Sequence, residues 1–266
     1  MNVVRQIFRG LGDTVQSFIL GRRYKSEIAG PMPDFVGLGA PRAGTSWLFQ
    51  QLSAHPQVRM ASPKEVHYFD WHVDRSPAWY ASHFSAEPGA VNGEVTPAYG
   101  HWLGFGRRRL MRTLLPNARF IYILRDPVER AWSHCVKVLE KDRKCSMEEV
   151  PAAQILRFID RSDCLAAGRY ARNLRHWQQL YPAERFHIGF YEDIAKTPKG
   201  LLKAVFEHIG VTTDVDWSRF PLHKRYHTTR VHPIPAEVLS RLRDAYAPDV
   251  PSLRAMFGDR TRNWVG

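Results

Sequence analysis

The chain has 266 residues, of which 38 are lysine or arginine and 26 are aspartate or glutamate, giving a formal net charge of +12. Its 44% hydrophobic and 24% charged residues are typical of a folded protein and exclude intrinsic disorder for most of the chain. The basic excess predicts an anionic partner, and leaves open nucleic acid, a membrane surface, or a small molecule bearing phosphate or sulfate. No run of about 18 apolar residues is present, so we expect no transmembrane helix.

The first 30 residues form a distinct segment, with apolar residues at helical spacing and basic residues around them. Asp13 and Gln16 interrupt its apolar stretch, so a secretory signal is not expected. Two interpretations remain open: a helix packed on the domain or on a second subunit, and a basic amphipathic helix in peripheral contact with a membrane. We therefore divide the chain into an N-terminal amphipathic helical segment, residues 1–30, and a single domain, residues 31–266.

The three cysteines, Cys135, Cys145 and Cys164, show no C-x-x-C spacing. They suit a reducing compartment and predict neither a disulfide framework nor a zinc site. Together with the missing secretory signal and anchor, they lead us to expect a cytoplasmic protein.

Short apolar runs bounded by polar or turn residues predict buried strands at 34–39, 119–124 and 186–191. Helical patterns lie between and after them, at 44–55, 106–115, 169–181, 198–209 and 235–247. Pro127 is well placed for the start of another helix. Strands that alternate with helices predict an α/β fold with a central, mostly parallel sheet flanked by helices.

The segment from Gly39 to Trp47 follows the first predicted strand and opens a helix. Backbone N–H groups and the helix dipole can hold a phosphate at such a position. The Gly39-x4-Gly44 spacing matches a P-loop, but Thr45 stands where an ATP- or GTP-using P-loop has lysine. The nearest cation is Arg42, two residues upstream of Gly44, and the loss of the lysine argues against phosphoryl transfer from a nucleoside triphosphate.

Three motifs carry a family resemblance. Pro41-Arg-Ala-Gly-Thr-Ser-Trp47 resembles the 5′-phosphosulfate loop of the sulfotransferases that use 3′-phosphoadenosine 5′-phosphosulfate (PAPS). Arg125-Asp-Pro followed by Ser133 is similar to the motif with which that family binds the 3′-phosphate. Lys64-Glu-Val-His-Tyr-Phe-Asp70 is similar to a stretch of the glycan sulfotransferases, including the heparan sulfate 3-O-sulfotransferases. The resemblance covers about residues 34 to 264 and implies a three-layer P-loop-like fold.

The resemblance implies transfer of a sulfuryl group from PAPS to a hydroxyl or amine, with PAP as the product and no metal. Glu65 is the candidate general base, since a neutral hydroxyl is a poor nucleophile. His67 is expected to orient the acceptor or Glu65, and Asp70 to hold His67. Arg42 is expected to stabilise charge on the leaving group, but an arginine cannot readily donate a proton to it.

The resemblance also implies a set of PAPS-binding residues. Arg125 and Ser133 would bind the 3′-phosphate. Trp47 is either a surface for adenine or a core aromatic, and Lys224 and Arg225 are either a late basic loop on the 3′-phosphate or a solvated pair. The 5′-phosphosulfate group would be held by Arg42, Ala43, Gly44, Thr45 and Ser46.

The acceptor is less constrained, and a carbohydrate or glycolipid is what the third motif implies. An aromatic cluster has two interpretations, a surface for sugar rings or core under a lid; its members are Trp71, His72, Trp79, Tyr80, His83 and Phe84. Two other functions are kept as alternatives: a P-loop kinase or NTPase, and a non-catalytic basic module that binds polyanions. A nucleic-acid partner is not expected, because no nucleic-acid-binding motif is found. The sequence does not fix the oligomeric state.

Overall fold

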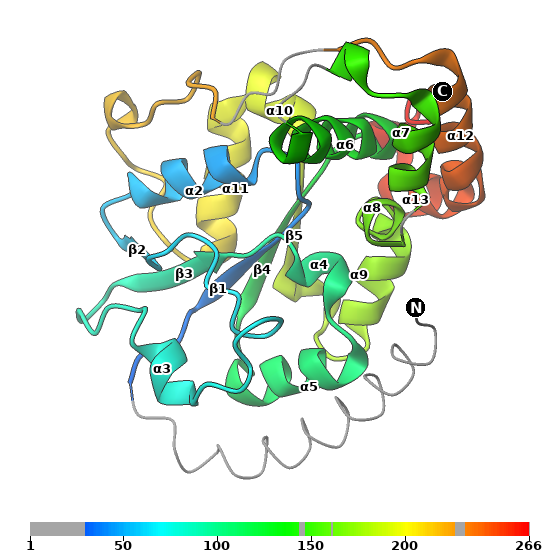
Figure 1. The fold of residues 1–266 in the computed structure, drawn as a ribbon. Helices are drawn as coiled ribbons and strands as arrows, with labels where there is room; N and C mark the ends of the chain where they lie inside the picture. Colours follow the sequence, from blue (N-terminus) through cyan, green and yellow to red (C-terminus); the bar gives the residue numbers. More distant parts are fainter. Residues whose placement is uncertain (1–29, 144–146, 161, 227–231, 266) are drawn as a thin grey trace.

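The computed structural model describes residues 30–143, 147–160, 162–226 and 232–265, and the predicted helix over the first 30 residues lies almost wholly outside them. Within these ranges the chain forms a five-stranded sheet in the order β2-β3-β1-β4-β5 (Figure 1). All paired strands are parallel. The strands are β1 (Phe35–Gly39), β2 (Val58–Met60), β3 (Val91–Val95), β4 (Arg119–Leu124) and β5 (Phe186–Phe190).

Helices connect the strands and cover both faces of the sheet. Their bounds are α2 (Thr45–Ser53), α3 (Pro77–Ala81), α4 (Tyr99–Trp102), α5 (Phe105–Leu114), α6 (Pro127–Arg143), α7 (Ala152–Ile159), α8 (Ser162–Ala166), α9 (Tyr170–Gln178), α10 (Tyr191–Lys196), α11 (Pro198–Ile209), α12 (Ala236–Tyr246) and α13 (Val250–Phe257). Figure 1 shows α2 and α11 together on one face of the sheet and α4 and α9 on the other. The predicted α/β architecture with a parallel sheet is therefore confirmed.

The apolar core has two parts. The larger part surrounds the sheet and includes every residue of β4 from Phe120 to Leu124. The smaller part lies among α6, α7, α8 and α12, beside the sheet. Cys135 and Cys164 are buried free thiols in this second part, whereas Cys145 lies outside the described residues.

Parallel strands bring all their carboxyl ends to one edge of the sheet, where ligands bind in open α/β folds. Gly39 of β1, Val95 of β3 and Leu124 of β4 end at this edge. The three sequence motifs follow β1, β2 and β4, so each begins at this same edge. In the described part of the chain, no helix is both long enough and apolar enough to cross a membrane.

Candidate active site

The phosphate-loop candidate is a tight turn between β1 and α2. Gly44 immediately precedes α2 with φ of 86°, and Arg42 has φ of 69°, which is rare for a residue with a side chain. No side chain caps the N-terminus of α2, so its first amides and its positive dipole end remain available to an anion. A Cβ on Gly44 would lie 2.3 Å from Cδ1 of Ile194, so α10 packs directly against the turn.

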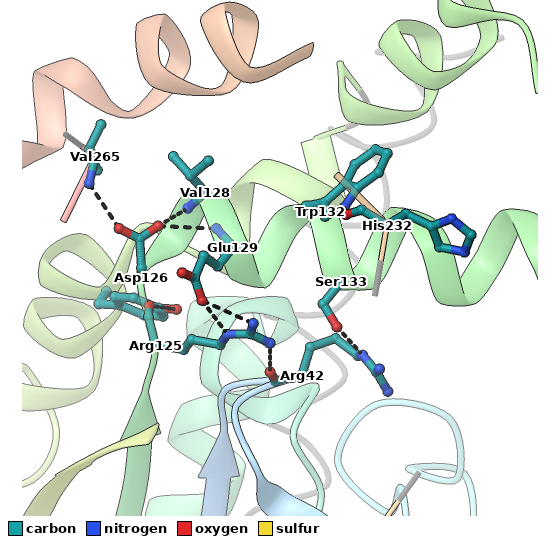
Figure 2. Close-up of polar contacts among 10 residues, drawn as sticks. Arg42, Arg125, Asp126, Val128, Glu129, Trp132, Ser133, His232 and Val265 are labelled. Atoms are coloured by element: carbon teal, nitrogen blue, oxygen red, sulfur yellow. Dashed lines mark hydrogen bonds and ion pairs between the residues drawn. The ribbon is translucent and has the colours of Figure 1, made fainter. Parts of the chain in front are cut away.

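The first and second motifs meet at the side chain of Arg42. Its Nε donates a hydrogen bond of 3.0 Å to Oγ of Ser133, a residue 91 positions away on α6. Nη1 of Arg125 approaches the carbonyl oxygen of Arg42 at 3.3 Å. Figure 2 shows the two guanidinium groups on either side of the turn, with Ser133 beside Arg42. The two motifs therefore build one cationic site.

Arg125 is held in place from several sides. Its guanidinium pairs with Glu129 at 3.0 Å and lies 4.5 Å from the ring centroid of Tyr191. Its own carbonyl accepts a 2.8 Å hydrogen bond from the hydroxyl of Tyr170. This fixed orientation means that an anion bound by Arg125 meets a guanidinium that is already positioned.

The loop between Arg125 and α6 is tied to the C-terminal part of the chain. Oδ1 of Asp126 accepts the backbone N–H groups of Val128 and Glu129 and caps α6, while Oδ2 accepts the N–H of Val265 at 2.9 Å (Figure 2). Further along α6, the indole N–H of Trp132 donates to the carbonyl of His232 at 2.9 Å. The helix that presents Ser133 is thus fixed at both its start and its side.

The electrostatics of Arg42 favour an anion. Its burial and the repulsion from Arg125 both lower its pKa from the ordinary 12.5. Burial disfavours the charge on Arg42 itself, and the neighbouring charge on Arg125 repels it, when no negative charge lies beside them. A phosphate or sulfate group relieves this repulsion, and the set of donors fits such a group.

Trp47 is only 4% exposed, which agrees with the core-aromatic alternative for this residue. Its indole N–H donates to the carbonyl of Leu222 at 2.8 Å, and Gln51 donates to the carbonyl of Pro221 at 3.0 Å. Trp47 and Gln51 therefore anchor the late loop to α2. Lys224 and Arg225 follow in that loop and are exposed, and Nζ of Lys224 lies 5.4 Å from the ring centroid of Tyr226.

The third motif forms a chain of ionic contacts around His67. Oε1 of Glu65 pairs with Nζ of Lys64 at 2.9 Å, and Oε2 lies 3.4 Å from Nε2 of His67. Nδ1 of His67 pairs with Oδ2 of Asp70 at 2.9 Å, and the Asp70 side chain is fully buried. The expected contact between Asp70 and His67 is present. His67 has φ of 56°, so like Arg42 it adopts a conformation that clusters at functional sites.

These contacts shift both central groups toward their charged forms. Burial alone would raise the pKa of Glu65, but the hydrogen bond from His67 and the charge of Lys64 outweigh it and lower the pKa to about 2. Burial would lower the pKa of His67, but hydrogen bonds to Asp70 and Glu65 raise it to about 9. At neutral pH Glu65 is a carboxylate that can accept a proton, and His67 is an imidazolium that donates from both nitrogens.

A buried network of polar side chains supports the Lys64–Asp70 motif. Glu94 of β3 accepts hydrogen bonds from the hydroxyls of Tyr80 and Thr96, the second at 2.8 Å. The hydroxyl of Tyr99 accepts the backbone N–H of Phe69 at 3.2 Å, next to Asp70. Burial raises the pKa of Glu94 to about 7, against the hydrogen bonds from Tyr80 and Thr96.

The same network links the third motif to the phosphate turn. The backbone N–H of Thr96 donates to the carbonyl of Gly37 at 3.1 Å. A Cβ on Gly39 would lie only 2.8 Å from the carbonyl oxygen of Pro97, so the segment after β3 packs closely on the end of β1. Through these contacts the Glu65 motif and the phosphate turn share one edge of the sheet.

Two residues of this site are absent from the sequence-based candidates. Glu94 lies in a strand that the hydrophobic pattern does not indicate, and Tyr191 is the last residue of the predicted strand 186–191. The signal for Tyr191 is its position directly after an apolar strand, where parallel strands present ligand-binding groups. The described residues contain no group of three or more His, Cys, Asp or Glu side chains placed to hold a metal ion.

The parallel sheet, the turn before α2 and the two adjacent arginines define an α/β protein with a P-loop-like fold. A model of the sulfotransferase domain matches residues 32–230, which is most of the chain. The chain therefore belongs to the sulfotransferase domain family.

Two human relatives are similar over most of this chain. Heparan sulfate glucosamine 3-O-sulfotransferase 3B1 is 27% identical over 266 residues, which cover 88% of this chain and 64% of that protein. Heparan sulfate glucosamine 3-O-sulfotransferase 6 is 28% identical, with 81% of this chain and 69% of that protein covered. The chain thus spans slightly less than two thirds of the first of these relatives. A sulfotransferase from Alicyclobacillus acidocaldarius shares the fold, with a TM-score of 0.68, 23% identity, and 85% and 96% of the two chains covered.

Proposed function

We propose that this protein transfers a sulfuryl group from PAPS to a hydroxyl group of a carbohydrate acceptor. The observation that carries the proposal is the contact of Arg42 with Ser133 and Arg125, which joins two anion-binding motifs into one site. PAPS carries two anionic groups on its ribose, a 3′-phosphate and a 5′-phosphosulfate, and the two motifs supply donors for each. When bound, PAPS supplies the sulfuryl group and a phosphate leaving group.

The donor half of the site binds and neutralises negative charge. In the proposal, the amides at the start of α2, the hydroxyls of Thr45 and Ser46, and Arg42 bind the 5′-phosphosulfate end. Arg125 and Ser133 bind the 3′-phosphate. Charge that develops on the leaving phosphate meets donors already in place, which lowers the barrier. Arg42 keeps its proton throughout, because a guanidinium does not titrate in the working range.

The acceptor half supplies the base. Glu65 is ionised at neutral pH and its side chain is 41% exposed, so an acceptor hydroxyl can approach it. Its lowered pKa makes it a weak base, so proton transfer accompanies formation of the S–O bond rather than preceding it. Displacement of Lys64 by the acceptor would raise the basicity of Glu65 when the reaction needs it. His67, held by Asp70, positions the carboxylate.

The carbohydrate acceptor is supported by the relatives, whose names specify the glucosamine of heparan sulfate. The net charge of +12 is compatible with an anionic glycan. The resemblance of the Lys64–Asp70 motif to glycan sulfotransferases points the same way.

Thermal shift and sulfuryl transfer test the proposal together. We expect PAP to raise the melting temperature far more than ATP with Mg²⁺, because Arg125 and Ser133 recognise a 3′-phosphate. We expect radiolabelled sulfate to pass from PAPS to heparan sulfate oligosaccharides, also in the presence of EDTA. Stabilisation by ATP with Mg²⁺ instead of PAP would favour the kinase or NTPase alternative. Binding of polyanions that is steeply salt-dependent but indifferent to loss of Arg125 would favour a non-catalytic module.

A further inference from the structure

Trp71 is the most exposed large apolar side chain of the described residues, at 67%. It directly follows the Glu65 motif. Trp102 is also exposed, at 56%, but it lies outside the Glu65 motif, and four other tryptophans are buried: Trp47, Trp132, Trp177 and Trp264. Large aromatic side chains stabilise a fold by burial, whereas an exposed indole next to a candidate base is placed to contact a ligand bound there.

The indole is fixed although it is exposed. The Trp71 backbone N–H donates to Oδ1 of Asp70 at 2.9 Å and to the carbonyl of His67 at 3.0 Å. Its ring stacks on the imidazole of His67, with the centroids 3.6 Å apart and the planes 9° from parallel. One face of the indole is therefore covered by His67, and its exposure belongs to the opposite face and the ring edges. A rigid flat apolar surface binds a ligand at low entropic cost.

The stack also sets a distance. Oε2 of Glu65 lies 3.4 Å from Nε2 of His67, so its carboxylate is held beside the His67 ring. A ring placed on the outer face of Trp71 is one further stacking distance away, about 7 Å from the His67 plane. A hydroxyl on that ring is beyond hydrogen-bond reach of Glu65. Trp71 and Glu65 therefore serve different rings of one ligand.

We propose that the outer face of Trp71 binds a second sugar ring of an oligosaccharide acceptor, adjacent to the ring whose hydroxyl faces Glu65. The inference rests on the proposed function and adds that the acceptor has at least two rings. Pyranose rings suit this surface because their axial C–H groups form an apolar face that packs on an indole, while their hydroxyls stay in water. A one-ring phenol would contact either Trp71 or Glu65, but not both.

Kinetics with two acceptors test the inference. The probes are an N-sulfated heparan sulfate tetrasaccharide and the methyl glycoside of N-sulfoglucosamine, with PAPS saturating. We expect Trp71→Ala to raise KM for the tetrasaccharide about tenfold, with kcat little changed. KM for the monosaccharide should stay as in the wild-type protein. KM of Trp71→Phe for the tetrasaccharide should lie between the values for the wild-type protein and for Trp71→Ala, because a smaller aromatic face remains.

Phe105→Ala is the matched control, since Phe105 is another exposed aromatic, at 46%. It should leave both acceptors unaffected. An equal loss of kcat with both acceptors on Trp71→Ala would show that Trp71 only positions His67, and would overturn the inference. A change in molar mass on Trp71→Ala, measured by light scattering, would mean that a second copy covers the indole, and would overturn it as well.

Calorimetric titration of the tetrasaccharide into the PAP complex separates this inference from the proposed function. Weaker binding by Trp71→Ala supports the inference even if no sulfate transfer occurs, in which case the reaction assignment fails alone. Equal affinity of the two proteins, or no binding by the wild-type protein, overturns the inference whatever the outcome of the transfer assay.

Discussion

Glu65 combines an ionised state with partial exposure, as a base for a hydroxyl requires. Glu65→Gln keeps the size and hydrogen-bonding shape of the side chain but cannot accept the proton. We expect kcat to fall at least about 100-fold while PAP affinity is unchanged. Glu87→Gln is the control, because Glu87 is likewise paired to a cation, Arg59, at the surface. A Glu65→Gln protein with normal turnover would rule out the assignment.

We expect Arg125 to contact the 3′-phosphate of the nucleotide and no other group of it. Arg125→Gln should weaken PAP binding by about 1.5–3 kcal/mol, since a charge-assisted contact is lost. Binding of adenosine 5′-phosphate, which has no 3′-phosphate, should hardly change. Isothermal titration with both nucleotides measures the difference, with the exposed Arg59→Gln as control. Equal losses for both nucleotides would mean that Arg125 supports the turn rather than binding the 3′-phosphate.

His67 links the site to pH. Its pKa is raised from 6.5 to about 9, so the ion pairs stabilise the fold fully below pH 6.5 and lose this effect as pH rises through about 9. Asp70→Asn removes one partner and should lower the pKa of His67, which the NMR titration of its ring protons measures directly. The difference in unfolding free energy between wild type and Asp70→Asn should therefore be larger at about pH 6 than at about pH 10. A His67 pKa unchanged by Asp70→Asn would contradict the contact.

The turn between β1 and α2 depends on Gly44 at the scale of elements. Gly44→Ala meets two obstacles: a φ of 86° and Ile194, which a Cβ would approach to 2.3 Å. Gly89→Ala is a matched control, with a similar φ of 78° and no atom within 4 Å of the added Cβ. We expect a loss of about 1 kcal/mol for Gly89→Ala and a larger loss for Gly44→Ala, by chemical denaturation. PAP affinity should fall only for Gly44→Ala; equal destabilisation of the two would show that α10 yields easily.

The agreement between pattern and structure varies from element to element. The predicted strand 119–124 and the predicted helix 198–209 match β4 and α11 residue for residue, because both have continuous apolar patterns and clear ends. β3 has no such pattern, since its buried residues include Asn92, Gly93 and Glu94. The side chains of Asn92 and Glu94 are buried because groups outside β3 satisfy them, the backbone of Ser85 for Asn92 and the Tyr80 and Thr96 hydroxyls for Glu94. A local pattern does not contain that information.

The site shows the same limit. Spacing and resemblance suffice to nominate Arg42, Arg125 and Ser133, because short motifs carry their own geometry. The sequence allows two interpretations of the aromatic cluster, a sugar-binding surface or core, and the structure divides its members. Tyr80 and Phe84 are buried, while Trp71 is exposed and stacks on His67. Exposure depends on the packing of the whole chain, so hydrophobicity alone could not separate these residues.

At the scale of the whole molecule, strand order brings the site together. β1 lies at the centre of the sheet, with β3 on one side and β4 on the other. The phosphate turn, which follows β1, therefore lies between two segments. One is the segment after β3, which links it to the Glu65 motif, and the other is the Arg125 loop after β4. Nothing in the individual segments specifies this order, which depends on pairing between strands that are far apart in the sequence.

The central position of β1 has a consequence for the synthesis of the protein on the ribosome. Phe35–Gly39 is translated well before both of its neighbours in the sheet, which end at Val95 and Leu124. Until both neighbours are synthesised, the apolar segment of β1 has no strand to pair with on either side, and such a nascent chain is prone to aggregation. Its cellular yield should therefore depend on chaperones that shield emerging chains.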